Sequence, residues 1–295
     1  MTSARFHILV ITSTIALLAP TYMACSEQLD LEKLKAAAAR GDAAAQYACG
    51  KAYSRGEGVA QNYSKAAEYY LKAAEQGNIG AQNNLGSLCL QGLGVKMDQS
   101  EAVKWFRKAA EQGDAIAQYN LGFSYERGTG IAQDNHEAAN WYEKAARQGV
   151  AEAQARLGSL YFWGENGVEK NYSKAAPWIQ KAAEQSNAVA ENTLGVMFEN
   201  GYGVERDAAR AIVWFSKAAE QGNAKAQSNL GRLYASGVGA KRDPAKAYQW
   251  LKLSSDQGEV TADHLLGELE ITFTKEEIGE GNRLIEQFSA GKHSQ

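Results

Sequence analysis

The side chains that could carry out chemistry are few, and their spacing matches none of the common catalytic or metal sites. The histidines are far apart in the sequence: His7, His136, His264 and His293. No carboxylates or cysteines group with them as zinc ligands would. His136 and Glu137 begin like the HExxH motif, but Asn140 stands where its second histidine belongs. The sequence therefore predicts no metal and no cofactor.

Two further motifs have simpler explanations than catalysis. Ser289 and Lys292 fit the SxxK pattern of penicillin-active serine enzymes, but they lie in the final segment, where nothing predicts a pocket. Gly128 and Gly130 form one of several GxG pairs, which no third glycine follows, so these pairs indicate turns rather than nucleotide-binding loops. Because no residue set supplies a nucleophile with its base, the sequence favours a protein that is not an enzyme.

The composition argues against a nucleic-acid partner. The formal net charge is -3, and residues 1–24 contain Arg5 and no acidic residue, so the chain without them carries 30 basic and 34 acidic side chains, or -4. No stripe of basic residues stands out along the chain. The 295 residues contain only three prolines and no linker-like stretch, which favours one continuous array over separate domains.

A unit of 36 residues recurs along almost the whole chain, and residues 98–133 are its clearest copy. Aligning the copies on the second residue of an Ala-Gln pair gives these positions: Gln46, Gln82, Gln118, Gln154, Glu191, Gln227 and Asp263. Every step is 36 residues except one of 37, from Gln154 to Glu191. A fixed period of this size is typical of solenoids, whose units bury their apolar stripes by stacking. We therefore expect an all-α solenoid, with seven helices of one kind interleaved with eight of another.

Two helices are predicted within each unit. In the copy at residues 98–133, Asp98 caps a first helix, which we call helix B, and Glu101 three residues later completes a capping box. Trp105 and Phe106 are predicted to be buried on helix B. Gly113 ends this helix, and Asp114 caps the second one, which we call helix A.

These residues resemble a known family, the Sel-one-like repeat (SLR), which is related to the tetratricopeptide repeat. Its pattern AQxxLGxLYxxGxGV followed by DxxKAxxWYxKAAEQG is matched by several copies between residues 31 and 288. The resemblance implies a right-handed superhelix of antiparallel helix pairs that serves as an adaptor or scaffold. A cysteine-rich branch of this family is associated with penicillin binding or hydrolysis. That alternative stays open, although the repeats here lack the recurring cysteine pairs.

The two ends of the chain are predicted to differ from the array. Residues 1–25 read as a signal peptide, because the apolar run is too short to span a bilayer. Cys25 is a candidate for lipidation, which predicts a periplasmic or envelope lipoprotein if the source is bacterial. The sequons at Asn62 and Asn171 leave a eukaryotic secretory-pathway adaptor as an alternative. Residues 31–288 are expected to form the repeat array with a capping helix at each end, and residues 289–295 to fray.

Helix A offers a predicted binding face. Turning helix A by about 100° per residue, with Cys49 on the buried side, directs Tyr47, Lys51 and Ser54 away from it. By analogy with tetratricopeptide arrays, the equivalents of these three positions, which we call the helix-A face, line the concave groove.

Eight residues form the predicted site for a protein or peptide partner. The aromatic members gather in the middle of the array: Tyr119, Phe123, Phe162 and Trp163. The flanking residues, predicted to hydrogen-bond a peptide backbone, are Asn84, Asn120, Arg156 and Asn229. The alternative is that the aromatics pack against the neighbouring superhelical turn and that the asparagines are structural.

Overall fold

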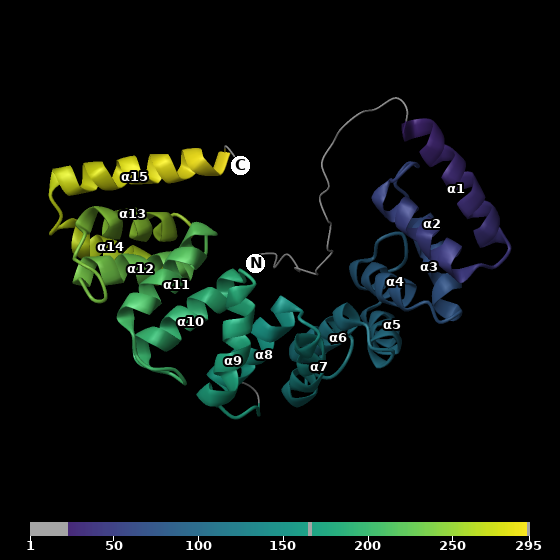
Figure 1. Ribbon diagram of the computed structural model, residues 1–295, viewed down its shortest axis with the longest axis horizontal. Helices are drawn as coiled ribbons and strands as arrows, with labels where there is room; N and C mark the ends of the chain where they lie inside the picture. Colours follow the sequence, from purple (N-terminus) through teal and green to yellow (C-terminus); the bar gives the residue numbers. More distant parts are fainter. Residues whose placement is uncertain (1–22, 165–166, 294–295) are drawn as a thin grey trace. The chain divides into compact units, whose positions relative to one another are not determined.

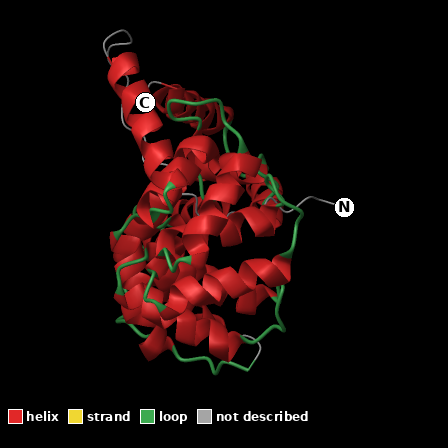
Figure 2. Ribbon diagram, turned by 90° about the vertical axis from the view of Figure 1, so that its right-hand side faces the viewer, coloured by secondary structure: helices red, strands yellow, loops and turns green. Residues whose placement is uncertain are grey.

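The computed structural model describes the backbone of residues 23–164 and 167–293, and the side chains of residues 31–164 and 167–291. Over this range the chain forms α-helices joined by short loops, with no strand (Figures 1 and 2). Residues 1–22 of the signal peptide predicted at residues 1–25 lie outside the described residues.

Helices of the two kinds alternate, which confirms the predicted pattern within the described part of the chain. The helices in the helix-B position are α1 (Met23–Ala39), α3 (Tyr63–Glu75), α5 (Gln99–Glu111), α7 (Asn135–Arg147), α9 (Tyr172–Glu184), α11 (Ala208–Glu220), α13 (Pro244–Ser255) and α15 (Lys275–His293). The helices in the helix-A position are α2 (Ala43–Arg55), α4 (Ile79–Gln91), α6 (Ala115–Arg127), α8 (Ala151–Trp163), α10 (Ala188–Asn200), α12 (Ala224–Ser236) and α14 (Val260–Glu270).

The helices fall into two compact units. Unit 1 ends at Val150 and contains α1 to α7, and unit 2 begins at Ala151 and contains α8 to α15. Within each unit, every helix A up to α12 packs on the helix B that follows it. Each helix A also packs on the helix B that precedes it in the same unit. Consecutive helices are therefore neighbours in space, as expected of a repeat array.

Side-chain caps fix where the helices begin. The Asp98 carboxylate accepts a hydrogen bond from the backbone N–H of Glu101 at 2.9 Å, and Asp114 accepts one from Ala117 at 2.7 Å. These bonds satisfy donors that a helix N-terminus would otherwise leave unpaired. Helix α6 ends before Gly128, whose φ of 67° lies in the left-handed region that favours glycine.

One glycine on helix A sets the distance between the two helices of each repeat. A Cβ atom at Gly122 would lie 2.8 Å from the ring of Tyr142 on α7, closer than real Cβ atoms approach. The equivalent glycine in the other complete repeats meets the large side chain at the second aromatic position of helix B: Tyr70, Phe106, Ile179, Phe215 or Leu251. Each of these side chains is nearly fully buried. The absent methyl group is therefore a packing requirement of the fold.

A ladder of buried glutamines links consecutive repeats. Four of them donate from Nε2, at 3.1–3.2 Å, to the backbone carbonyl eight residues earlier: Gln46, Gln82, Gln118 and Gln227. Their Oε1 atoms each accept a bond of 2.7–2.8 Å from a second glutamine 30 residues later. Glu191 replaces a glutamine at one rung, where it is 2% exposed and accepts a bond of 2.6 Å from Gln221.

The C-terminal end of unit 2 departs from the repeat pattern. Helix α15 lies along α13, with the ring of Phe288 5.3 Å from that of Trp250, instead of covering α14 as a helix B would (Figure 1). It continues to His293, through most of the segment expected to fray.

In unit 1, Cys49 and Cys89 are free thiols buried in the core, and burial raises the pKa of each.

Candidate partner-binding face

The eight predicted site residues divide between the two units. Those in unit 1 are Asn84, Tyr119, Asn120 and Phe123, and those in unit 2 are Arg156, Phe162, Trp163 and Asn229.

The helix-A face is more enclosed than the sequence predicted. The Tyr47 ring centroid lies 5.9 Å from that of Tyr70 on α3, and Ser54 Oγ lies 3.0 Å from the Tyr70 hydroxyl. These two positions thus contact helix B of their own repeat instead of pointing away from the core. The physical reason is that helix A packs on two B helices, so its buried arc is wider than one stripe. Lys51, between them, is half-buried.

The aromatic residues of unit 1 pack largely within their own repeat. Tyr119 is 5% exposed, and its ring centroid lies 5.7 Å from that of Tyr142 on α7. Phe123 is half-buried, with its ring 6.3 Å from Tyr119 and the guanidinium carbon of Arg127 5.7 Å from its centroid. Tyr119 therefore belongs to the contact between α6 and α7, whereas Phe123 keeps part of its ring accessible.

The predicted asparagines form bonds inside the protein. Asn120 donates from Nδ2 to Oδ1 of Asn83 at 3.0 Å, and Asn229 donates to Asn192 at 3.1 Å. Each bond joins the helix A of one repeat to that of the repeat before it. Asn84 interacts with the Tyr70 hydroxyl, whose pKa is raised by burial and lowered in part by its hydrogen bonds to Ser54 and Asn84. These contacts give the asparagines a structural role.

A cluster of aromatic rings in unit 2 surrounds the end of α8. Phe162 is 2% exposed, and its ring centroid lies 5.2 Å from Tyr172 and 6.0 Å from Tyr202. The latter two rings stack at 4.6 Å with an interplanar angle of 9°. Trp163 packs edge-on against Phe162 at 4.7 Å, yet it is 56% exposed. Phe162 is thus a core residue, whereas Trp163 presents its indole to solvent.

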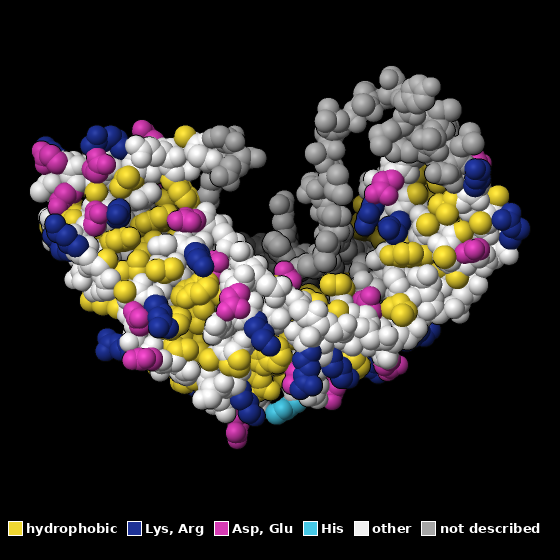
Figure 3. Space-filling model, in the orientation of Figure 1, with side chains coloured by type: hydrophobic (Ala, Val, Ile, Leu, Met, Phe, Trp, Pro, Cys, Tyr) yellow, Lys and Arg dark blue, Asp and Glu magenta, His cyan; other side chains and the backbone are white. Residues whose placement is uncertain are grey.

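An ion pair lies on the helix-A face in unit 2. One guanidinium nitrogen of Arg232 on α12 donates to both carboxylate oxygens of Glu199 on α10, at 2.7 and 2.8 Å. Arg156 on α8 is half-buried and is among the residues with interactions inside the protein. Figure 3 shows basic and acidic side chains interspersed on the visible face of unit 2. A partner for this face would need both hydrogen-bonding and apolar groups.

Sequence reasoning missed two members of the aromatic cluster, Tyr172 and Tyr202. Tyr172 begins α9 and Tyr202 lies in the loop before α11, so neither occupies a recurring aromatic position of the repeat. A partial signal was present, because Tyr172 follows the inserted loop at residues 164–167, but Tyr202 lies in the turn of the next repeat, where the sequence gives no such signal. The described residues contain no group of three or more His, Cys, Asp or Glu that could hold a metal ion. None of the described helices has the length and apolarity needed to cross a membrane.

The packing of helix A on helix B within each repeat, together with the glutamine ladder between repeats, defines an α/α solenoid. The Sel1 repeat model matches residues 43–78, 79–114, 115–150, 151–187, 188–223 and 224–259. Because these matches cover well over half of the chain, the protein belongs to the Sel1 repeat family, which confirms the resemblance to SLR proteins.

A solved structure supports the same assignment. A Sel1 repeat protein from Oxalobacter formigenes is 35% identical, with a TM-score of 0.68, and the match covers 79% of this chain and 93% of that one. Two more distant similarities were also found. A protective antigen of uropathogenic Escherichia coli with an SLR fold is 28% identical (TM-score 0.40, coverage 89% and 72%), and an immunity protein from Pseudomonas aeruginosa is 24% identical (TM-score 0.42, coverage 75% and 83%). A search of curated proteins gave no match.

Proposed function

We propose that this protein is a non-catalytic adaptor that binds an extended or helical segment of a partner protein outside the cytoplasm. Sel1 repeat proteins generally mediate protein–protein interactions, and the family fold is typically a non-catalytic scaffold. The proposal that this protein binds a partner segment rests on the surface of unit 2. The predicted signal peptide supports export, and Cys25 supports attachment to the envelope by lipidation.

The exposed indole of Trp163 carries the proposal. A tryptophan that is 56% exposed at the end of α8 leaves a large apolar surface in water. Its ring is nevertheless held in place, because it packs edge-on against the buried Phe162. A rigid, accessible aromatic ring suits an interface anchor, since such residues carry a large share of binding energy at low entropic cost.

The test compares Trp163→Ala with a matched control, Met97→Ala, which removes a side chain of similar exposure (61%) from a loop of unit 1. Both variants should melt like the wild type. Loss of the anchor should weaken capture of an envelope protein by about 2 kcal/mol, or roughly 30-fold in Kd. The control should bind normally. Equal capture by Trp163→Ala and the wild type would refute the site.

Two further variants separate binding from folding. Phe162→Ala should lower stability by about 3–5 kcal/mol, because it empties a buried site, and is therefore not evidence about binding. Phe123→Ala tests the half-buried ring in unit 1 on its own, and its combination with Trp163→Ala tests whether one partner uses both rings. A lower Tm of the Trp163→Ala variant would show that Trp163 contributes to the core and is not a binding residue.

A further inference from the structure

The repeat array ends differently at its two termini, and each end lacks the helix that the other end presents. At the start of unit 1, α1 is a helix B, and no helix A precedes it among the described residues. By the repeat register, Leu34 is equivalent to Tyr70 and Phe106, which are 2% and 1% exposed. Leu34 itself is only half-buried, as is Ala37. No described helix therefore covers the side of α1 that a helix A covers elsewhere.

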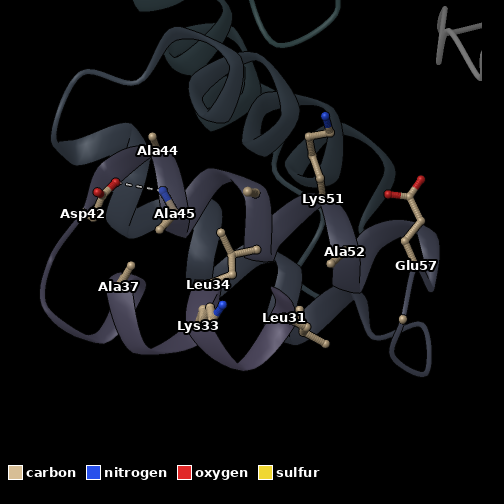
Figure 4. Close-up of a pocket in the computed structure, with 12 residues that line it drawn as sticks. Leu31, Lys33, Leu34, Ala37, Asp42, Ala44, Ala45, Lys51, Ala52 and Glu57 are labelled. Atoms are coloured by element: carbon tan, nitrogen blue, oxygen red, sulfur yellow. Dashed lines mark hydrogen bonds between the residues drawn. The ribbon is translucent and has the colours of Figure 1, made fainter. Parts of the chain in front are cut away.

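This opening forms a groove between α1 and α2, which we call the N-terminal groove (Figure 4). Its volume is about 990 Å³. The lining is mainly apolar and small: Leu31, Leu34 and Ala37 from α1, and Ala44, Ala48 and Ala52 from α2. Two basic and two acidic residues also contribute to the lining: Lys33, Lys51, Asp42 and Glu57. The groove has the place that a preceding helix A would occupy if the array continued toward the N-terminus.

At the end of unit 2, α14 is a helix A that packs on the helix B before it but is not covered by α15, the helix that follows it. In the six complete repeats, a Cβ on the helix-A glycine would come within 2.5–2.8 Å of its own helix B. At the equivalent Gly267 nothing lies within 4 Å. The reason is that α15 packs on α13 instead.

The open side of α14 is a stripe formed by His264 and Gly267, together with Ile271 at the C-cap of the helix, which we call the α14 stripe. In unit 1 the equivalent positions are Tyr47, Gly50 and Ser54, and all three contact Tyr70 of their own helix B. In the α14 stripe, Ile271 is 87% exposed and the His264 side chain is 73% exposed. Ile271 is the most exposed large hydrophobic residue in the described part of the chain.

The repeat register, and not charge, matches the two ends. Helix α1 carries two lysines against three acids, and Arg40 follows it, so this end has no net positive charge. In each complete repeat, the place beside the helix-A glycine is filled by the large side chain at the second aromatic position of helix B. Leu34 holds that position on α1, and the place beside Gly267 on α14 is unfilled.

We propose that copies of this chain associate end to end, with the α14 stripe of one copy packed on α1 in the N-terminal groove of the next. The contact continues the interface between helix A and helix B found within each repeat, with Leu34 against Gly267. It is a heterologous interface, because the two surfaces differ, so each copy keeps one free end and the assembly grows beyond a dimer unless it closes into a ring.

The test uses sedimentation of the purified full chain over a concentration series, with each end blocked in turn. Ile271→Asp blocks the α14 stripe at a highly exposed residue, and Ala44→Arg blocks the N-terminal groove at an exposed lining residue. Leu34→Glu is a second groove variant. The wild type should gain mass with concentration, while each variant alone should stay monomeric with an unchanged circular dichroism spectrum.

Mixing the two kinds of variant gives the decisive result. Ile271→Asp retains a free groove and Ala44→Arg retains a free stripe, so an equimolar mixture should form one contact per pair, double the monomer mass and then stop growing. A wild type that stays monomeric at every concentration would overturn the proposal. So would single variants that still dimerise, because that behaviour indicates a symmetric interface elsewhere.

Discussion

Glu191→Gln should stabilise the protein at neutral pH, which is unusual for a substitution at a buried position. At the equivalent rung, Gln227 donates from Nε2 to the carbonyl of Ala219 at 3.1 Å and accepts from a second glutamine. Glu191 keeps the accepting role, through its bond to Gln221. An ionised carboxylate has no hydrogen to donate to the carbonyl of Ala183, the residue eight positions earlier.

The expected gain follows from the missing bond. A neutral hydrogen bond contributes about 1 kcal/mol net, and the substitution also removes a charge from a site that is 2% exposed. Two features offset part of this gain: the short bond from Gln221 is charge-assisted, and the nearby Lys217 ammonium favours the ionised form. A net gain of about 1 kcal/mol would raise Tm by about 2–4 °C in a protein of this size class.

The gain should depend on pH in a defined direction. Burial is the largest influence on Glu191, and it raises the pKa of this carboxyl above its usual value of 4.5; the field of Glu220 acts in the same direction, whereas Gln221 and Lys217 lower the pKa. Because the folded pKa is raised, the stability contributed by the protonated form is present below the usual value and is lost as pH rises through the folded pKa. A protonated carboxyl can donate to Ala183 as a glutamine does. The advantage of Glu191→Gln should therefore shrink in acid.

Thermal unfolding of wild type and variant, followed by circular dichroism between about pH 4 and pH 8, measures this difference. Gln227→Glu is the matched control, because it places a carboxyl at an equivalent rung of unit 2 and should destabilise most at neutral pH. A Glu191→Gln variant that melts at or below the wild-type temperature at neutral pH would refute the reasoning. An increase of the same size at every pH would show that protonation of Glu191 is irrelevant.

The packing of the repeats and the ends of the chain lead to three other predictions. Gly122→Ala should lower the free energy of unfolding by about 1–3 kcal/mol, because the added methyl group crowds Tyr142. Gly267→Ala should leave the stability unchanged or raise it by up to about 1 kcal/mol. Equal changes in Tm for the two variants would contradict this expectation. Truncation from Thr274 should uncover the apolar side of α13 and cause aggregation, visible in light scattering; an equally soluble truncated protein would argue against a capping role. Mass spectrometry of protein from its native source should find no Met1; an unmodified Cys25, or a start beyond it, would exclude lipidation but not export.

Much of the fold could be predicted from the sequence because the structural signals are local and repeated. Asp98 and Asp114 cap helices as expected, and the period places each helix A and helix B from α2 to α14 in register. Where the period fails, prediction failed too. The position of α15 on α13 depends on a contact between Phe288 and Trp250 that no repeat pattern encodes.

The candidate site was harder to predict, because exposure depends on neighbours that are distant in the sequence. Phe162 was expected on the helix-A face, yet it is buried by Tyr172 and Tyr202, which lie outside the recurring aromatic positions. Asn120 was predicted to hydrogen-bond the backbone of a bound peptide, but its side-chain amide donates a hydrogen bond to Asn83 in the preceding repeat. Only the three-dimensional structure separates Trp163, which is exposed, from Phe162 beside it.

Site-specific photo-crosslinking in the native host tests the adaptor function most directly. A photoreactive amino acid would replace Trp163 at the end of α8 and, as a matched control in a separate variant, Val213 on α11, which is similarly exposed at 53%. If the protein binds a partner segment beside α8, position 163 should give a discrete covalent adduct with another protein, and position 213 should not. Absence of a protein adduct at position 163, or the same adducts at both positions, would contradict the proposed function.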